Sequence, residues 1–321
     1  GVQMILLVED SIRFYSSILP NLYNYILEQS KNFSQEALNR HAATMRMRGR
    51  PKVVLARTYE EAQKLYDKYS DNTLGVISDA RFPLKSAAKA FGNEVMPEEK
   101  PKHRTDTFGR EKCPDAGLQL FRYIRKNDPF VPLIIESSES ENRAKAEAEG
   151  FRFVDKNSKK MSVDLRRLME EHMGFGDFIF RDPKTHEEIM RIHSLKELQD
   201  NIFNIPNDSM LYHISRNHMS RWLCARAIFP VSAFLKHVTW EKLQDVDAQI
   251  IFDAIVQYRH MKNIGVVAVF DRMKFDKYAH FARIGEGSLG GKGRGLAFLD
   301  NIIKRHPEFN QYENATVQIP K

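Results

Sequence analysis

The sequence contains little cysteine and no long apolar run. Cys113 and Cys224 lie far apart, so no disulfide framework is indicated and a reducing compartment, such as a bacterial cytoplasm, is expected. No stretch reaches the roughly 18 apolar residues of a membrane-spanning helix, and the early run Met4–Val8 is too short for a secretory signal. A soluble cytoplasmic protein with no membrane partner is therefore predicted.

The residues that are present suffice for two compact units. Of 321 residues, 42% are hydrophobic and 28% are charged, which excludes a disordered chain, and the length is about twice that of a typical domain. The net charge of +7 would suggest nucleic acid if it were concentrated on one face. Most of it comes from one segment, 37–59, which has six basic residues and no acidic ones. Such a segment is either a solvated surface or a docking patch for an acidic partner.

The first half alternates strand-like and helix-like segments. The apolar runs are typical of strands buried on both faces, and each precedes an amphipathic stretch. We expect strands at 4–8, 52–56, 74–78, 131–135 and 151–154, and helices at 11–29, 59–69, 115–126, 140–149 and 162–173. Five such units predict a doubly wound α/β domain with a five-stranded parallel sheet over residues 1–173.

Two connections are longer than this domain needs. The stretch between Asp10 and Asp79 exceeds two average units by about 20 residues, which we place near 30–50. The second insertion, 84–114, is polar, contains three prolines and is predicted to be a surface excursion. It begins directly after a strand-end motif, at a position from which it can cover that edge of the sheet.

Beyond Gly174 the pattern is mainly helical. Ser194 and Glu197 form a capping-box pattern that opens a helix ending before Pro206. Further helices are expected at 209–229 and 248–263, and a strand at 265–270. We therefore predict a mainly helical connector over 174–280.

The histidine, cysteine and aromatic residues of this connector are not expected to form a metal site. His213, His218 and Cys224 are separated by five and six residues, which does not place them on one helix face, so zinc is not expected. Trp222 and Phe229 are assigned to the core.

Charged and polar side chains follow four of the predicted strands. Glu9 and Asp10 follow the first strand, Asp79 the third, Ser137 the fourth and Lys156 the fifth. Because ligands of an open α/β sheet bind at the carboxyl ends of its strands, we expect these side chains to meet. Three carboxylates about 4 Å apart repel by roughly 1 kcal/mol per pair in water and by about 4 kcal/mol at an effective dielectric constant of 20. They need a cation, and hard oxygen ligands suit Mg²⁺.

The motifs at these strand ends resemble those of the receiver domain of two-component response regulators. They are Val8-Glu-Asp-Ser11, Ile77-Ser-Asp-Ala-Arg-Phe-Pro83, Pro132-Leu-Ile-Ile-Glu-Ser137 and Phe153-Val-Asp-Lys156, in family order. The resemblance covers residues 1–172 and implies the flavodoxin-like strand order 2-1-3-4-5. It also implies a phosphorelay, with a histidine kinase or phosphotransfer protein as the partner.

The resemblance implies a metal site as well. Asp10, Asp79 and the backbone carbonyl of Arg81 would bind Mg²⁺ directly, and Glu9 would act through water.

The family further implies the catalytic and switch residues. Asp79 would be the nucleophile that forms an acyl phosphate, with Lys156 as a second cation. Ser137 would turn its hydroxyl toward the phosphoryl oxygens and vacate space near Phe153, the aromatic residue of the switch.

Two residues depart from the family pattern. Asn157 follows Lys156 where the family usually has proline, which leaves the geometry of the lysine loop open. Glu136 stands at a normally apolar position, where it either perturbs the site or faces solvent.

A glycine-rich segment near the carboxyl terminus carries a second resemblance. Leu289-Gly-Gly-Lys-Gly-Arg-Gly-Leu296 precedes a predicted helix, where backbone amides can approach an anion. It is not a P-loop, because no Ser or Thr follows Lys292. It resembles the start of the nucleotide-binding domain of phosphoenolpyruvate synthase and pyruvate phosphate dikinase, whose lysine contacts ATP phosphate. The sequence stops at Lys321, where such a domain has scarcely begun, so we expect residues 281–321 to be the start of a truncated nucleotide-binding domain. Gly1 in place of methionine likewise indicates a trimmed sequence, and Lys292 would contact ATP only in the full-length protein.

Three hypotheses for the function follow. The first is a phosphorylated receiver that regulates its own downstream phosphotransferase domain, of the phosphoenolpyruvate synthase kind. The second is a receiver-like domain without phosphorylation, used for docking or dimerisation; a homodimer is compatible with both. The third, a DNA-binding regulator, is not expected, because no convincing helix-turn-helix follows Gly176. Residues 1–321 alone are not expected to be a complete enzyme.

Overall fold

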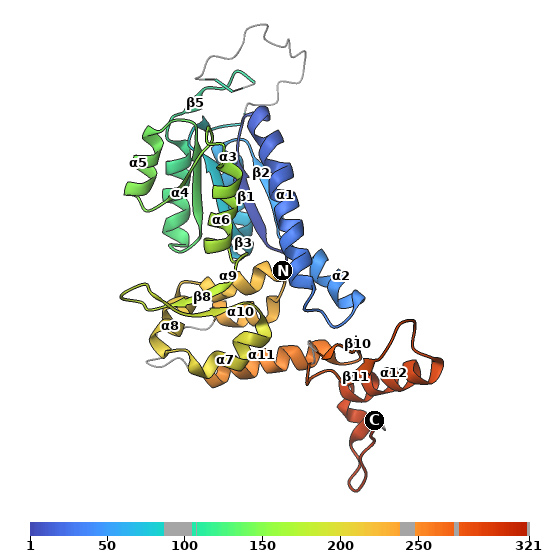
Figure 1. Ribbon diagram of the computed structural model, residues 1–321. Helices are drawn as coiled ribbons and strands as arrows, with labels where there is room; N and C mark the ends of the chain where they lie inside the picture. Colours follow the sequence, from blue (N-terminus) through green and yellow to red (C-terminus); the bar gives the residue numbers. More distant parts are fainter. Residues whose placement is uncertain (87–104, 107, 238–247, 273–275, 320–321) are drawn as a thin grey trace.

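A five-stranded parallel sheet forms the centre of the first half. The computed structural model describes residues 1–86, 105–106, 108–237, 248–272 and 276–319. The sheet order is β2-β1-β3-β6-β7, so the predicted order 2-1-3-4-5 is confirmed (Figure 1). Its strands are β1 (Met4–Val8), β2 (Lys52–Ala56), β3 (Thr73–Asp79), β6 (Leu133–Ser137) and β7 (Arg152–Asp155).

Helices cover both faces of this sheet. Along β1, Ile5 and Leu7 face one helical layer, whereas Leu6 and Val8 face the other, as the alternation of side chains along a strand requires. The first layer contains α1 (Ile12–Ser34) and α6 (Met161–His172). The second contains α3 (Tyr59–Tyr69), α4 (Ala116–Asn127) and α5 (Glu141–Ala148). The predicted fold class is confirmed.

The two long connections have different structures. Helix α1 continues through Pro20 to Ser34, five residues beyond its predicted end at residue 29, and α2 (Arg40–Arg48) follows it without a buried residue. Of the insertion 84–114, residues 87–104 and 107 lie outside the described part. Its last residues form β5 (Lys112–Cys113), which pairs antiparallel with β4 (Phe82–Pro83).

The segment after Gly174 begins with a β-hairpin that the sequence pattern did not predict. Strands β8 (Phe178–Arg181) and β9 (Glu188–Ile192) pair antiparallel, and helices follow. They are α7 (Leu195–Asn201), α8 (Asn207–Ser215), α9 (His218–Ala225), α10 (Phe229–His237) and α11 (Ala248–Asn263).

The prediction of one continuous helix over 209–229 is wrong, whereas two other helix predictions are confirmed. Asn217 and Ala227 both adopt φ near 58°, so left-handed residues divide the segment into α8, α9 and α10. Asparagine tolerates this conformation, and no glycine or proline stands beside Asn217, whereas Pro230 lies in the first turn of α10, just after the second break. The Ser194 hydroxyl caps α7 by accepting a hydrogen bond from the Glu197 amide at 3.1 Å, as predicted, and α11 matches the predicted 248–263.

The last described part is small. Strands β10 (Val267–Val269) and β11 (Phe281–Arg283) pair in parallel, and α12 (Gly291–Arg305) follows. Short 3₁₀ turns occur at Ser70–Asn72, Ile202–Asn204 and Pro307–Asn310. Within the described ranges no helix is long and apolar enough to cross a membrane.

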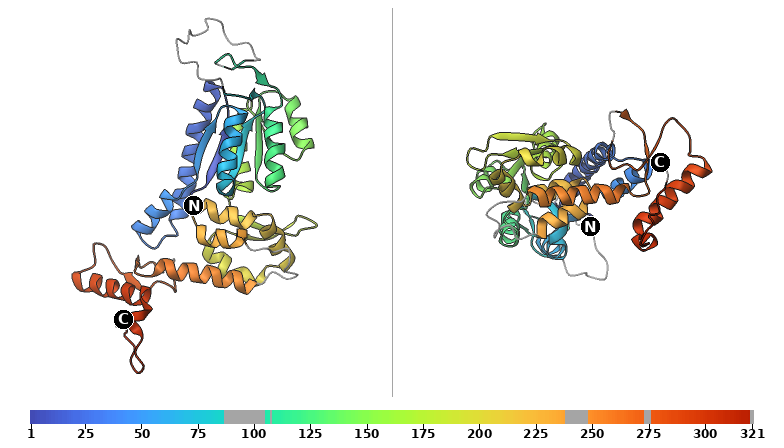
Figure 2. Two further views of the ribbon diagram at one scale, coloured as in Figure 1. Left: turned by 180° about the vertical axis from the view of Figure 1, so that it is seen from behind. Right: turned by 90° about the horizontal axis from the view of Figure 1, so that it is seen from below.

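The helical part packs against the amino ends of the sheet strands (Figures 1 and 2). Arg226 is buried there and donates hydrogen bonds to the carbonyls of Gly174 at 2.7 Å and Gly176 at 2.8 Å. Its guanidinium lies 4.1 Å from the ring centroid of Phe33 and 4.0 Å from that of Trp222. Arg226 thus fixes the boundary segment 174–176 to α9 and contacts α1 of the first unit through Phe33.

Candidate functional site

The carboxyl ends of β1 and β3 and the turn after β7 bring four charged residues together. One carboxylate oxygen from each of Glu9, Asp10 and Asp79 lies within 4.8 Å of the others. The Lys156 ammonium forms ion pairs with Glu9 and, at 3.2 Å, with Oδ2 of Asp79. The structure therefore places these four predicted site residues in one cluster.

The three carboxylates differ in their exposure. The side chains of Glu9 and Asp10 are fully buried, whereas that of Asp79 keeps 14% of its surface exposed. Asp79 also accepts a hydrogen bond from the Ala80 amide at 2.7 Å on Oδ1. Among the three, Asp79 is the carboxylate that a molecule outside the protein can reach.

Burial and mutual repulsion disfavour charge on the inner carboxyl groups. Burial, reinforced by Asp79, raises the pKa of Glu9 to about 8, although Lys156 opposes this shift. Burial likewise raises the pKa of Asp10. Burial tends to lower the pKa of Lys156, but the charges of Asp79, Glu9 and Glu136 outweigh it and raise that pKa. The cluster has an excess of negative charge that one lysine does not balance.

A second lysine reaches the cluster from the insertion. The ammonium of Lys112 on β5 lies 2.8 Å from Oδ2 of Asp10, and its side chain is 16% exposed. Sequence reasoning missed this residue, because Lys112 lies 33 positions after Asp79 in a polar segment with no recognisable pattern.

Glu136 lies inside the protein beside the cluster. It pairs with Asp79 in the register of β3 and β6, it is fully buried, and neither of its side-chain oxygens accepts a hydrogen bond from a described residue. Burial raises its pKa to about 7, with Lys156 opposing and Asp79 reinforcing the shift. Of the two predicted possibilities, exposure to solvent is therefore wrong.

The remaining predicted residues surround the cluster. The Ser137 hydroxyl accepts hydrogen bonds from the Asn142 side chain at 2.9 Å and the Glu139 amide at 3.1 Å. The Arg81 side chain forms an ion pair with Glu139 at 3.1 Å. Phe153 is half-buried, and the Arg143 guanidinium lies 4.6 Å from its ring centroid.

The lysine loop is held by Asn157 without a proline. Its side chain donates to the Ser138 carbonyl at 2.9 Å, its amide donates to Asp155 at 2.8 Å, and the Lys156 amide donates to the Ser137 carbonyl at 3.0 Å. With Asn157 at this position in place of proline, Lys156 still reaches the carboxylates.

The donor set fits a hard divalent cation. Three carboxylates converge, and Oδ1 of Asp10 is buried without a hydrogen bond from any described residue. A magnesium ion favours one or two carboxylates plus water or phosphate oxygens.

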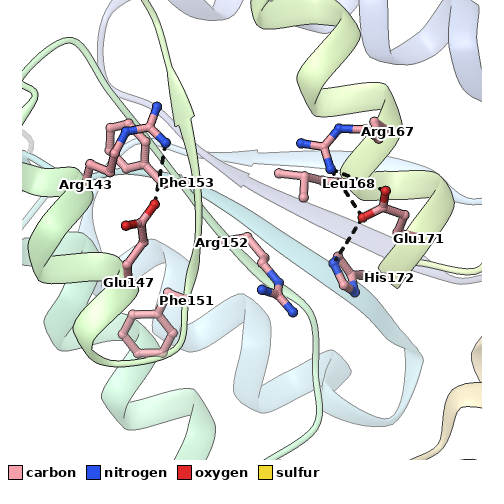
Figure 3. Close-up of a pocket in the computed structure, with 9 residues that line it drawn as sticks. All are labelled: Arg143, Glu147, Phe151, Arg152, Phe153, Arg167, Leu168, Glu171 and His172. Carbon is pink, nitrogen blue, oxygen red and sulfur yellow. Dashed lines mark hydrogen bonds and ion pairs between the residues drawn. The ribbon is translucent and has the colours of Figure 1, made fainter. Parts of the chain in front are cut away.

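A separate pocket of about 310 Å³ lies between α5, β7 and α6, away from the carboxylates. Figure 3 shows the guanidinium groups of Arg143, Arg152 and Arg167 around it, together with Phe153 and His172. Phe153 is thus shared between the pocket and the predicted switch.

Two other groups of predicted residues lie outside the cluster. His213 and His218 lie on two different helices, α8 and α9, and the break at Asn217 brings their Nδ1 atoms to 3.0 Å, so the spacing argument for a single helix does not apply to this pair. Cys224 contacts the Ser232 hydroxyl instead. Lys292 is exposed in the first turn of α12, at the far end of the molecule from β5.

Comparison with known proteins finds similarity to several solved structures. No protein-family profile matches the sequence, and no curated protein matches it. A solved structure, described as a response regulator receiver domain protein from Clostridium thermocellum, matches 53% of this chain and 94% of its own length at 17% identity and a TM-score of 0.31.

Proposed function

We propose that this chain is a phosphoryl-accepting receiver whose nucleophile is Asp79. The observation that carries the proposal is the cluster itself: two buried carboxylates, one reachable carboxylate and a lysine meet at the carboxyl edge of a sheet with the order 2-1-3-4-5. Such an edge is where open α/β sheets bind ligands.

In the proposed reaction, a carboxylate oxygen of Asp79 attacks the phosphorus of a partner's phosphohistidine. The bond between phosphorus and the histidine nitrogen breaks, its electron pair returns to the nitrogen, and the imidazole leaves in neutral form after taking up a proton. Aspartate is a known nucleophile of this type. The exposed 14% of the Asp79 side chain gives the donor access.

The surrounding residues position and stabilise the transferred group. Lys156 is held between Glu9 and Asp79 and would shift toward the phosphoryl oxygens as they arrive. A Mg²⁺ ion held by Asp10, Asp79 and the Arg81 carbonyl, with Glu9 through water, would offset the negative charge of the phosphoryl group.

Ser137 would link the site to the surface. Both of its described hydrogen bonds use the hydroxyl oxygen as acceptor, so its proton remains available for a phosphoryl oxygen. Turning that hydroxyl would loosen its bond to Asn142 on α5 and change the space beside Phe153, which lines the pocket in Figure 3.

One experiment tests the proposal directly. The purified chain is incubated with Mg²⁺ and acetyl phosphate, and its intact mass is compared with those of Asp79→Asn and Asp253→Asn, the latter an exposed aspartate on α11. We expect one added phosphoryl group in the wild type and Asp253→Asn, and none in Asp79→Asn. No added mass in the wild type, or equal addition in Asp79→Asn, would refute the proposal.

The alternative is a docking or dimerisation module that is never phosphorylated. The ion pair between Lys112 and Asp10 favours it, because a second lysine offsets part of the charge without a metal. Control of an attached phosphotransferase, with ATP at Lys292, remains a prediction of the sequence resemblance, as do a cytoplasmic location and a histidine kinase partner.

A further inference from the structure

We propose that Lys112 is a built-in counter-ion of the acidic cluster, which competes with the divalent cation for Asp10 and is released when that cation binds. This inference rests on the proposed function, because it assumes that the cluster binds such a cation. It assigns a role to the insertion, which lies outside the five strand and helix units of the domain.

The position of Lys112 is set by its backbone. In the β4–β5 pair, Lys112 stands opposite Pro83 and Cys113 opposite the buried Phe82. Because β4 begins three residues after Asp79, this pairing holds the lysine directly over the carboxyl edge of the sheet.

The chain just before β5 is also held in place. The buried carboxylate of Asp106 accepts hydrogen bonds from the amides of Phe108 at 3.0 Å and Arg110 at 2.7 Å, and from the Arg110 side chain at 2.6 Å. These bonds close the turn that leads into Lys112, so its approach to Asp10 is part of an ordered segment.

The distribution of charge explains why Lys112 is needed in the absence of a metal. Lys156 already pairs with Glu9 and Asp79, which leaves the fully buried Asp10 with Lys112 as its ion-pair partner. A buried carboxylate without a partner is costly, so the ammonium stabilises the metal-free site.

The same ammonium opposes a cation. Oδ2 of Asp10 forms the ion pair with Lys112, while Oδ1 is buried without a hydrogen bond from a described residue. A divalent cation bound at either oxygen would share one carboxylate with a positive ammonium, and like charges at such distances repel strongly in a buried site. Binding of the cation therefore favours a state in which Lys112 has turned away toward solvent.

Isothermal calorimetry with Mg²⁺ alone tests the competition. It compares the wild type with Lys112→Met and with Lys126→Met, which removes the same charge from an exposed position at the end of α4. We expect Kd to fall at least about tenfold in Lys112→Met, equivalent to about 1.4 kcal/mol, and to stay unchanged in Lys126→Met. Equal affinities of all three proteins would overturn the inference. Absence of Mg²⁺ binding in all three would overturn it together with the metal site of the proposed function.

A second measurement uses the unmodified protein. Lysines are acylated briefly with and without Mg²⁺, and the modification of Lys112 is compared with that of Lys126 by peptide mass spectrometry. We expect Mg²⁺ to raise the Lys112 to Lys126 ratio several-fold, because the ammonium loses its partner. An unchanged ratio in protein that calorimetry shows to bind Mg²⁺ would contradict the release of Lys112, while leaving the proposed phosphoryl transfer intact.

Discussion

Replacing Glu136 by glutamine should make the stability of the metal-free protein less dependent on pH. Glu136 is fully buried, and none of the described residues donates a hydrogen bond to its carboxyl oxygens. Its pKa is raised from 4.5 to about 7, chiefly by burial. Glutamine has nearly the same shape as the protonated acid and cannot ionise.

The sign and size of the effect follow from this shift. Because the folded protein holds the proton more tightly than the unfolded chain, the wild type loses no stability below pH 4.5 and loses it progressively as the pH rises toward 7. The rise of the Glu136 pKa from 4.5 to about 7 corresponds to a loss of about 3 kcal/mol of stability above pH 7. Glu136→Gln avoids this loss.

Urea unfolding in the presence of a chelator, at pH 5 and at pH 8, measures the difference. The free energy of unfolding of Glu136→Gln relative to the wild type should rise by about 2 to 3 kcal/mol between these values. Glu141→Gln, at the exposed start of α5, serves as the matched control and should show little change. A relative stability of Glu136→Gln that is the same at both pH values would refute the reasoning.

Two further substitutions test the packing around the site and at the junction with the helical part. In Gly117→Ala, the added Cβ would lie 2.3 Å from the Asp79 carbonyl oxygen, so α4 must shift. We expect the free energy of unfolding to fall by about 1 to 3 kcal/mol and Mg²⁺ binding to weaken. An unchanged thermal midpoint and an unchanged Kd for Mg²⁺ would contradict this. Arg226→Met removes the donors to Gly174 and Gly176, which should cost about 3 kcal/mol in urea unfolding; a loss below about 0.5 kcal/mol would show that the contact is not structural.

The sheet and the carboxylate cluster were predictable because their signals are local and repeated. Continuous apolar runs identify strands buried on both faces, and the carboxyl ends of parallel strands meet at one edge. Glu9, Asp10, Asp79 and Lys156 each stand within two residues of such an end, so their meeting needed no knowledge of side-chain packing.

Other features depend on contacts between distant segments. Lys112 reaches Asp10 through a two-residue strand pair, β4–β5, which is too short to leave a periodic pattern. The helix break at Asn217 has no glycine or proline beside it, and the contact of His213 with His218 follows from this break. Burial of Glu136 is likewise a property of the assembled sheet and not of its neighbours in sequence.

The packing beneath the sheet bears on how this protein can be recombined. Phe175 and Ala225, from the segment after α6, belong to the same core as Ile5, Leu22 and Tyr25. A domain exchanges readily between proteins when few contacts cross its boundary. Joining residues 1–173 to a foreign partner would remove Phe175 and Ala225 from that core and expose the surface that α9 covers. In gene fusion or engineering, the sheet and the helices through α10 are therefore best moved as one cassette.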